Sequence, residues 1–315
     1  MASDTRSAAS ARRGLSLIVF AAVLWGTVGV ATRATYEVAD TNALSIGFYR
    51  LLFSLPVLLV VGWRTLGGRL LRIGRRDLLP MGIIGVMMAL YQVCLFSAIP
   101  LVGVSIAVLI TLCTAPVLVA LASAALFGEK PTVRVGLALL GALGGSALLV
   151  APGEGGQGAV NLVGVLFALG SAAGYATLTL SSRSLASRYH PIQPLLIGFA
   201  AGAAMLLPFA LLNGLTVAFP AEGWGLLVYL GVVPTALAYI LFMAGMRHIS
   251  ATVASIITLL EPLTAAVLAW LFFREQLGGT ALLGAALLLG AIVVLSLPKR
   301  TVQPQVAPVE TGAGD

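Results

Sequence analysis

Apolar residues run along this chain in long blocks, and charged residues occur almost only between the blocks. A helix that crosses a bilayer needs roughly 20 apolar residues. A charge at the bilayer centre costs about 2.5 to 3.5 kcal/mol, so charge-free windows mark the spans. The pattern predicts an all-α polytopic membrane protein with ten helices, at Leu15–Thr32, Ala43–Trp63, Leu78–Ala98, Val102–Phe127, Val133–Val150, Val160–Ser181, Ile192–Leu212, Gly223–Gly245, Ala251–Phe273 and Gly279–Leu297.

Two stretches need interpretation before the chain can be divided. The charge-free run from Leu78 to Gly128 is too long for one span, and Pro100 with Gly103 is expected to supply the turn. The first apolar block resembles a signal peptide, but it lacks a small-x-small cleavage site and is interpreted as a retained helix. The expected division is a tail (1–14), a first five-helix unit (15–151), a glycine-rich linker (152–159), a second five-helix unit (160–298) and a disordered tail (299–315).

Composition narrows the class of protein further. Of 315 residues, 59% are hydrophobic and 9% are charged, whereas about a quarter of a soluble protein is charged. Ten spans use about 200 residues, which leaves no room for an appended soluble catalytic domain. Cys94 and Cys113 both lie inside apolar blocks, with no spacing typical of a disulfide or a metal site, so no cofactor and no metal are expected.

The basic residues have an informative distribution. Their surplus, 18 Lys and Arg against 11 Asp and Glu, gives a net charge of +7, which in a membrane protein encodes orientation rather than nucleic-acid binding. If the N-terminus is cytoplasmic, the cytoplasmic segments hold fifteen Lys and Arg, and the outer segments hold two, Arg33 and Arg274. Cytoplasmic N- and C-termini are therefore predicted.

The chain also contains an internal repeat. Pro116 and Glu129 recur as Pro262 and Glu275, in both cases 146 positions later, and Gly85 recurs at the same spacing. Each unit holds five helices, an odd number, so the second copy enters the membrane from the opposite side. Inverted repeats of this kind build secondary transporters that work by alternating access around a midplane site.

The residues that repeat also carry a family resemblance. The segments are SIAVLITLCTAPVLVALASAALFGEKPTVRVGLALLGALGG and ATVASIITLLEPLTAAVLAWLFFREQLGGTALLGAALLLG. They resemble the two EamA-type domains of the drug/metabolite transporter superfamily, over nearly the whole membrane region. The resemblance implies a bacterial inner-membrane exporter of amino acids or other metabolites. It also implies a central cavity lined by the first, third, fourth, sixth, eighth and ninth helices.

Several polar and aromatic side chains lie deep in the predicted spans, where a polar group needs a protein partner or water. Trp and Tyr normally anchor helices at the membrane surface, and these lie too deep for that role. Their flat faces and single polar tips suit a substrate with apolar and polar parts. The candidate substrate-binding residues are Trp25, Tyr91, Gln92, Thr111, Tyr175, Thr235 and Tyr239. For any single hydroxyl, a bond to a backbone carbonyl one turn away explains its presence equally well.

Two charges lie within the spans, and Glu261 is the deeper. Its carboxylate is expected either to gain and lose a proton during coupling or to bind a substrate ammonium. A structural role is equally open, because Pro262 frees a carbonyl one turn back. Pro116 and Pro262 are the candidate hinge or kink residues. The position of Arg50 near the outer end favours a structural role, such as pairing with loop carbonyls or with Asp40.

The leading hypothesis is a secondary transporter that exports small metabolites, most of all amino acids, by alternating access. The alternative is a membrane scaffold or interaction protein with a packed core. Sequences typical of hydrolases, metalloproteases and ATP-binding proteins are absent, so neither an enzyme nor an ATP-driven pump is expected. Gly141 and Gly145 resemble a small-xxx-small interface, which fits a monomer or a weak homodimer in contact with membrane lipid.

Overall fold

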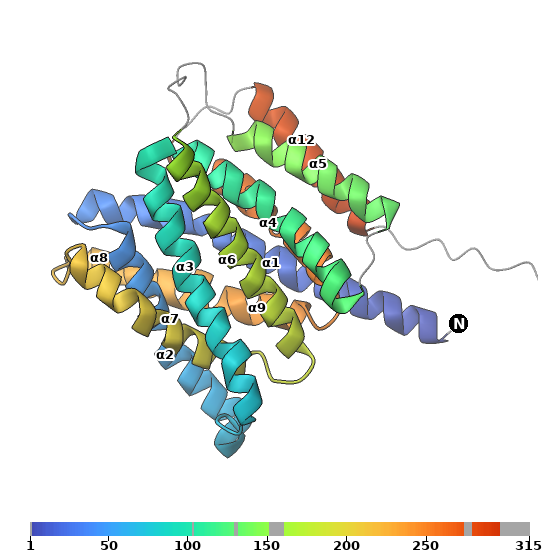
Figure 1. The fold of residues 1–315 in the computed structure, drawn as a ribbon, viewed down its shortest axis with the longest axis horizontal. Coiled ribbons are helices and arrows are strands. Elements are labelled where there is room, and N and C mark those ends of the chain that lie inside the picture. The colour runs from blue at the N-terminus through green and yellow to red at the C-terminus, as the bar shows by residue number, and fades with distance from the viewer. Residues whose placement is uncertain (1, 103, 129–131, 151–160, 274–278, 297–315) are drawn as a thin grey trace, which may run out of the picture.

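The computed structural model describes residues 2–102, 104–128, 132–150, 161–273 and 279–296, nearly all of them helical (Figure 1). The elements are α1 (Ala2–Val38), α2 (Ala43–Leu66), η1 (Gly67–Arg69), η2 (Arg75–Asp77), α3 (Leu78–Val102), α4 (Val104–Phe127), α5 (Val133–Val150), α6 (Leu162–Ala186), α7 (Ile192–Leu212), α8 (Ala221–Gly231), η3 (Val232–Leu237), α9 (Ala238–Gly245), α10 (Ala251–Ile257), α11 (Leu260–Phe273) and α12 (Gly279–Ser296). Within the described residues, eight helices are long and apolar enough to cross a membrane. Two shorter apolar helices, Val133–Leu148 and Leu282–Val294, bring the fold to the expected ten.

The boundaries differ from the prediction in a few places. The first helix extends well beyond the apolar block at both ends, because a helix can continue into water once its apolar part is anchored. The helix α3 runs through Pro100 to Val102, so the chain does not turn at Pro100. Gly103, the expected linker, the C-terminal tail, Glu129 and Glu275 lie outside the described residues.

Side-chain caps fix the start of several helices. Asn42 accepts a hydrogen bond from the backbone N–H of Ser45 at the start of α2. Asn161 and Ser250 cap α6 and α10 in the same way. These polar caps satisfy N–H groups that have no partner inside the helix, which matters most where a helix end approaches the bilayer.

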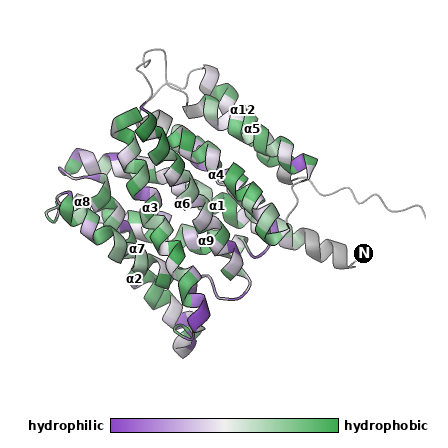
Figure 2. Cartoon of the chain, viewed as in Figure 1, coloured by the Kyte–Doolittle hydropathy of each residue, from purple (hydrophilic) through white to green (hydrophobic). Residues whose placement is uncertain are grey.

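Successive helices run in opposite directions, so their ends define two faces of the molecule. We call the face that carries Arg69, Arg72, Arg75 and Arg76, in the connection between α2 and α3, the basic face. The opposite face, where α1 ends and α2 begins, is the mouth face. The helix α1 starts at the basic face and α6 at the mouth face, so the two five-helix units are inverted (Figure 1). Hydrophobic residues cover nearly all the helices, and hydrophilic ones gather toward helix ends (Figure 2).

The helices pack into two bundles. One bundle consists of α3, α4 and α6, which pack against one another. The other consists of α1, which packs against α8, α9, α10 and α11. The pairs α2–α7 and α5–α12 lie beside the bundles, and α5 and α12 form a separate layer (Figure 1).

Glycines let these helices approach closely. A methyl group added to Gly85 of α3 would lie 1.7 Å from the carbonyl oxygen of Gly198 in α7. Gly145 of α5 lies against the backbone of Gly284 and Leu288 in α12, and Gly141 faces Ala291. The small-residue face of α5 therefore packs against α12 within the chain.

The second unit contains two irregularities that have no counterpart in the described part of the first. A π-helical turn, η3, interrupts the eighth predicted span around Pro234, and the ninth breaks at Thr258 between α10 and α11. A proline cannot donate a backbone hydrogen bond, and its ring clashes with the carbonyl four residues earlier, which for Pro262 belongs to Thr258. The corresponding parts of α3 and α4 are continuous, so Pro116 lies inside an unbroken helix.

Candidate functional site

A cavity of about 730 Å³ lies between the two bundles and opens at the mouth face. At the mouth its lining includes Arg33 and Tyr36 of α1, and Tyr36 is 44% exposed. The walls come from α1, α2, α3, α4 and α11. A smaller space of about 40 Å³ forms the inner end, lined by Trp25, Val28, Arg50, Met88, Tyr91, Tyr175, Tyr239 and Glu261. Five of these eight residues line both spaces, so the cavity continues into the inner end.

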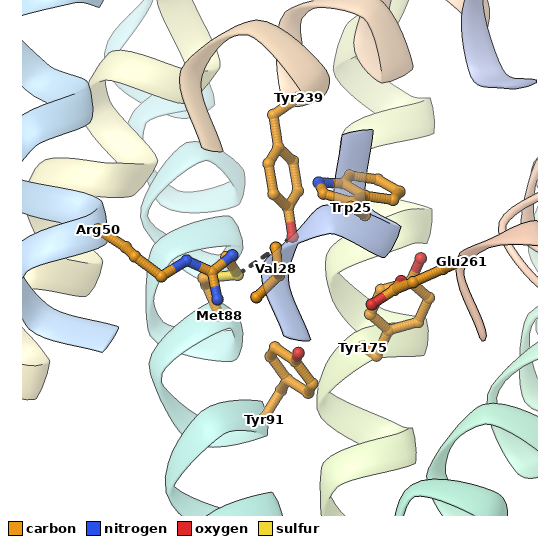
Figure 3. Close-up of a pocket in the computed structure, with 8 residues that line it drawn as sticks. All are labelled: Trp25, Val28, Arg50, Met88, Tyr91, Tyr175, Tyr239 and Glu261. Carbon is orange, nitrogen blue, oxygen red and sulfur yellow. Dashed lines mark hydrogen bonds between the residues drawn. The ribbon is translucent and has the colours of Figure 1, made fainter. Parts of the chain in front are cut away.

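Opposite charges face each other at the inner end. The guanidinium of Arg50 enters from α2 and the carboxylate of Glu261 from α11, on opposite sides of the space (Figure 3). They interact electrostatically but form no ion pair within 4.0 Å. No side chain in the described ranges donates a hydrogen bond to the Glu261 carboxylate. Both groups are therefore free to bind a ligand between them.

Thr235 fixes the position of Arg50 from behind. The Nε–H of Arg50 donates to Thr235 Oγ1 at 3.3 Å, and the Thr235 hydroxyl donates to the Leu230 carbonyl at 2.7 Å. That second bond spans five residues, in the register of the π-helical turn. Thr235 is fully buried and does not line the cavity, and Arg50 does not pair with Asp40. Thr235 therefore lies behind the cavity wall, and Arg50 forms part of the wall.

Aromatic rings form the inner wall around the charges. The ring centroids of Trp25 and Tyr239 are 4.8 Å apart, and those of Tyr91 and Tyr175 are 6.0 Å apart in an edge-to-face arrangement. The Tyr239 hydroxyl contacts Met88 Sδ at 3.4 Å (Figure 3). These four predicted aromatic residues come together at one place, from α1, α3, α6 and α9, although they are far apart in sequence.

The remaining predicted residues divide between the cavity and the packing. Gln92 lines the cavity, and its Oε1 lies against Gly47 of α2 without a hydrogen-bond donor. Thr111 does not line it, because its hydroxyl donates to the Ala168 carbonyl of α6. Pro262 lines the cavity beside Glu261. Thr111 therefore takes the structural role open to any buried hydroxyl.

The sequence missed two contributions to the cavity. Val28 and Met88 line the inner end, and apolar residues within apolar helices give no signal of their own. The helix α2 forms part of the wall, although the family resemblance implied only the first, third, fourth, sixth, eighth and ninth helices. Arg50 was the available signal for α2, but its position near the outer end of the span favoured a structural role.

The two bundles close against each other toward the basic face. There α10 packs against α4 and α6, whereas α11 packs against α1 and lines the cavity. Arg183 of α6 donates to the Met246 carbonyl at 2.5 Å, and Arg247 donates to the Ala186 carbonyl at 2.6 Å. We call this reciprocal pair, Arg183 and Arg247, the arginine clasp. Arg183, near the end of α6, thus binds a carbonyl just after α9. Arg247, just after α9, binds a carbonyl at the end of α6.

Further contacts at the basic face join the two five-helix units. Asp77 accepts hydrogen bonds from Arg188 at 2.9 Å and from the Tyr189 hydroxyl at 2.5 Å. Nearby, burial lowers the pKa of the His190 imidazole, and the charge of Arg247 adds to the effect. The basic face is thus sealed by polar contacts, whereas the mouth face is open.

The comparisons with known proteins agree with this architecture. The model of the EamA-like transporter family matches residues 12–151 and 162–297, one match for each five-helix unit. An uncharacterized transporter of Archaeoglobus fulgidus is 31% identical over 90% of this chain and 96% of its own. The uncharacterized transporter YwfM of Bacillus subtilis is 28% identical, over 90% and 94%.

Two further proteins are similar to this chain over most of its length. The uncharacterized inner membrane transporter YicL of Salmonella typhimurium is 27% identical over 92% of this chain and 97% of its own. A crystal structure described only as that of a protein superposes with a TM-score of 0.77 over 89% of this chain and 96% of the other, at 24% identity, which shows the fold alone. The chain is a multi-pass membrane protein and belongs to the EamA-like transporter family.

Proposed function

We propose that the protein is a secondary transporter that exports small metabolites, amino acids above all, across the bacterial inner membrane by alternating access. The observation that carries the proposal is the cavity. It reaches from the mouth face to the space between Arg50 and Glu261, and packed side chains separate that space from the basic face. A site near the middle of the membrane, reached from one side at a time, is what alternating access requires.

The lining of the inner end supports amino acids as substrates. Glu261 offers a carboxylate to an ammonium group, and the aromatic rings of Trp25 and Tyr91 offer faces to an apolar side chain. The lining also brings one cation and one anion to the same space. A zwitterion neutralises both, whereas a purely cationic or anionic ligand leaves one charge without a partner in a poorly hydrated site.

The packing supports alternating access. The main contacts between the bundles involve α10 and α9, near the basic face, together with the arginine clasp. Separating the bundles there and closing them at the mouth face would move the opening to the other side. The inverted repeat provides for this exchange, since each unit can adopt the conformation of the other.

Orientation and oligomeric state belong to the same proposal. The positive-inside distribution supports a cytoplasmic location for the basic face and both termini, with the mouth facing outward. The Salmonella relative is named as an inner membrane transporter, which supports a location in the inner membrane. The exposed apolar side chains on the outer surface, such as Leu140 and Leu283, fit contact with lipid around a monomer.

Flux measurements in proteoliposomes test the proposal. Purified protein should exchange labelled neutral amino acids well above empty liposomes. Glu261→Gln should lower that exchange about tenfold or more, since a hydrogen bond to a charged group contributes about 1.5 to 3 kcal/mol. Glu222→Gln, at an exposed position in the first turn of α8, is the matched control and should leave exchange unchanged.

The opposite result would favour the scaffold. Absence of flux for amino acids, amines and sugars would contradict transport of small metabolites. A scaffold requires a packed core, and a cavity of about 730 Å³ lined by charged groups counts against it.

A further inference from the structure

We infer that Arg50 is an anion-binding residue for the carboxylate of the transported ligand and that Thr235, on the π-helical turn, is its positioning residue. The inference deepens the proposed function by assigning one end of the substrate to one side chain. It rests on the geometry around Arg50, which is independent of the cavity's overall size.

Only one N–H donor of the Arg50 guanidinium has a partner among the described residues. The guanidinium has five N–H donors on three nitrogens, in a rigid planar fork. Its Nε–H donates to Thr235 Oγ1, and neither Nη group has a hydrogen-bond partner among the described residues. The two Nη groups form an edge that matches the two oxygens of a carboxylate.

Among the described residues, no carboxylate lies within ion-pair distance of this edge. Glu261 lies across the space beyond ion-pair distance, and Asp40 is exposed in the connection between α1 and α2. Glu37 pairs with Arg33 at the mouth, at 3.4 Å. An unpaired cation inside a membrane protein is costly and usually marks a ligand pathway. A ligand carboxylate would supply the missing counter-charge.

The π-helical turn explains how the edge formed by the Arg50 Nη groups is oriented. Thr235 is fully buried and held by its bond to the Leu230 carbonyl, so its hydroxyl oxygen is a fixed acceptor for Arg50 Nε. Gly231, one turn earlier, lies against Phe53 and the backbone carbonyl of Arg50, which locks α2 to this segment. Backbone and side chain of Arg50 are therefore both held by the irregular part of the eighth span.

Thermal unfolding of the purified protein at about pH 6 with L-phenylalanine or L-phenylalaninamide tests the inference, because both probes keep the α-ammonium at that pH and differ at the carboxyl group. We expect phenylalanine to bind the wild type about tenfold more tightly than the amide, because only its carboxylate can form a charge-assisted hydrogen-bonded pair with Arg50. Arg50→Gln should abolish this preference, and Arg50→Lys should retain only part of it, since an ammonium lacks the planar edge.

Substitutions of Thr235 separate positioning from folding. Thr235→Val keeps the shape and removes the hydroxyl, and it should weaken phenylalanine binding while amide binding stays the same. Thr235→Ser should restore the preference. Thr177→Val is the matched control, because Thr177 donates to the Ala173 carbonyl of its own helix at an exposed position. If Thr235→Val does not fold, Thr235→Ser still tests positioning, and the comparison of Arg50→Lys with Arg50→Gln still tests whether Arg50 binds the carboxylate.

The outcomes distinguish the two claims. A wild type that shows no preference for phenylalanine over its amide, or an Arg50→Gln variant that keeps the preference, overturns the inference even if flux is observed. A preference that depends on Arg50 in a protein without flux would instead support the inference and contradict the transport proposal.

Discussion

At the scale of single residues, position relative to the cavity decides the role of each polar group. The presence of Trp25, Tyr91 and Glu261 in the cavity lining was predictable, because aromatic and charged side chains deep in a membrane are costly without a function. The sequence did not show that Thr111 and Thr235 lie outside the cavity lining. A hydroxyl that lines a cavity and a hydroxyl that bonds a carbonyl can occupy the same positions on a helix. Only the three-dimensional neighbours distinguish the two.

His190 carries a prediction about pH. Burial, with the charge of Arg247, lowers the pKa of its imidazole, so the folded protein binds the proton less well than the unfolded chain. This stability is present above the ordinary pKa of about 6.5 and is lost as the pH falls through it toward the lowered value. Between about pH 7.5 and pH 5.5, the Tm of the wild type should fall more than that of His190→Gln. Equal falls of the Tm in the two proteins would contradict a lowered pKa of His190.

At the scale of elements, the ten helices were predictable from charge spacing, but their interruptions were not. Pro262 follows the break between α10 and α11, and Pro234 lies within η3, yet Pro116 stands in a continuous helix. A proline disfavours the local backbone, and tertiary packing decides whether the helix breaks there. The cavity contribution of α2 was likewise missed, because the packing of α2 depends on partners far along the chain.

The crossing of α3 and α7 gives a prediction at this scale. Gly85→Ala should destabilise the protein by about 1 to 3 kcal/mol, because its methyl group would meet the Gly198 backbone, which cannot move aside cheaply. The measurement is the Tm in detergent. Gly82→Ala, in the same helix with no atom near its added methyl, should be neutral or slightly stabilising. Similar losses for both variants would argue against the close crossing.

At the scale of the whole molecule, the inverted topology was predictable because five is odd and basic residues alternate between the two sides. Which end of the cavity is open was not, because that depends on side-chain packing between the bundles. The structure closes the basic face with the arginine clasp and with the contacts of Asp77.

Orientation in the membrane can be measured directly. In a variant with Cys94 and Cys113 replaced by serine, Asp40→Cys at the mouth face should react with an impermeant maleimide in spheroplasts. Arg72→Cys at the basic face should react only after lysis. Labelling of the second site in intact spheroplasts would reverse the proposed orientation.

The interruptions confined to the second unit have a consequence for kinetics. Among the described residues, the turn η3 and the break between α10 and α11 have no counterpart in the first unit, although the two units share a topology. We therefore expect bending to concentrate in the second unit, because an interrupted helix has fewer backbone hydrogen bonds to lose than a continuous one. The two open conformations are then unequal in free energy, and we expect the KM for substrate added on one side of the membrane to differ from the KM on the other.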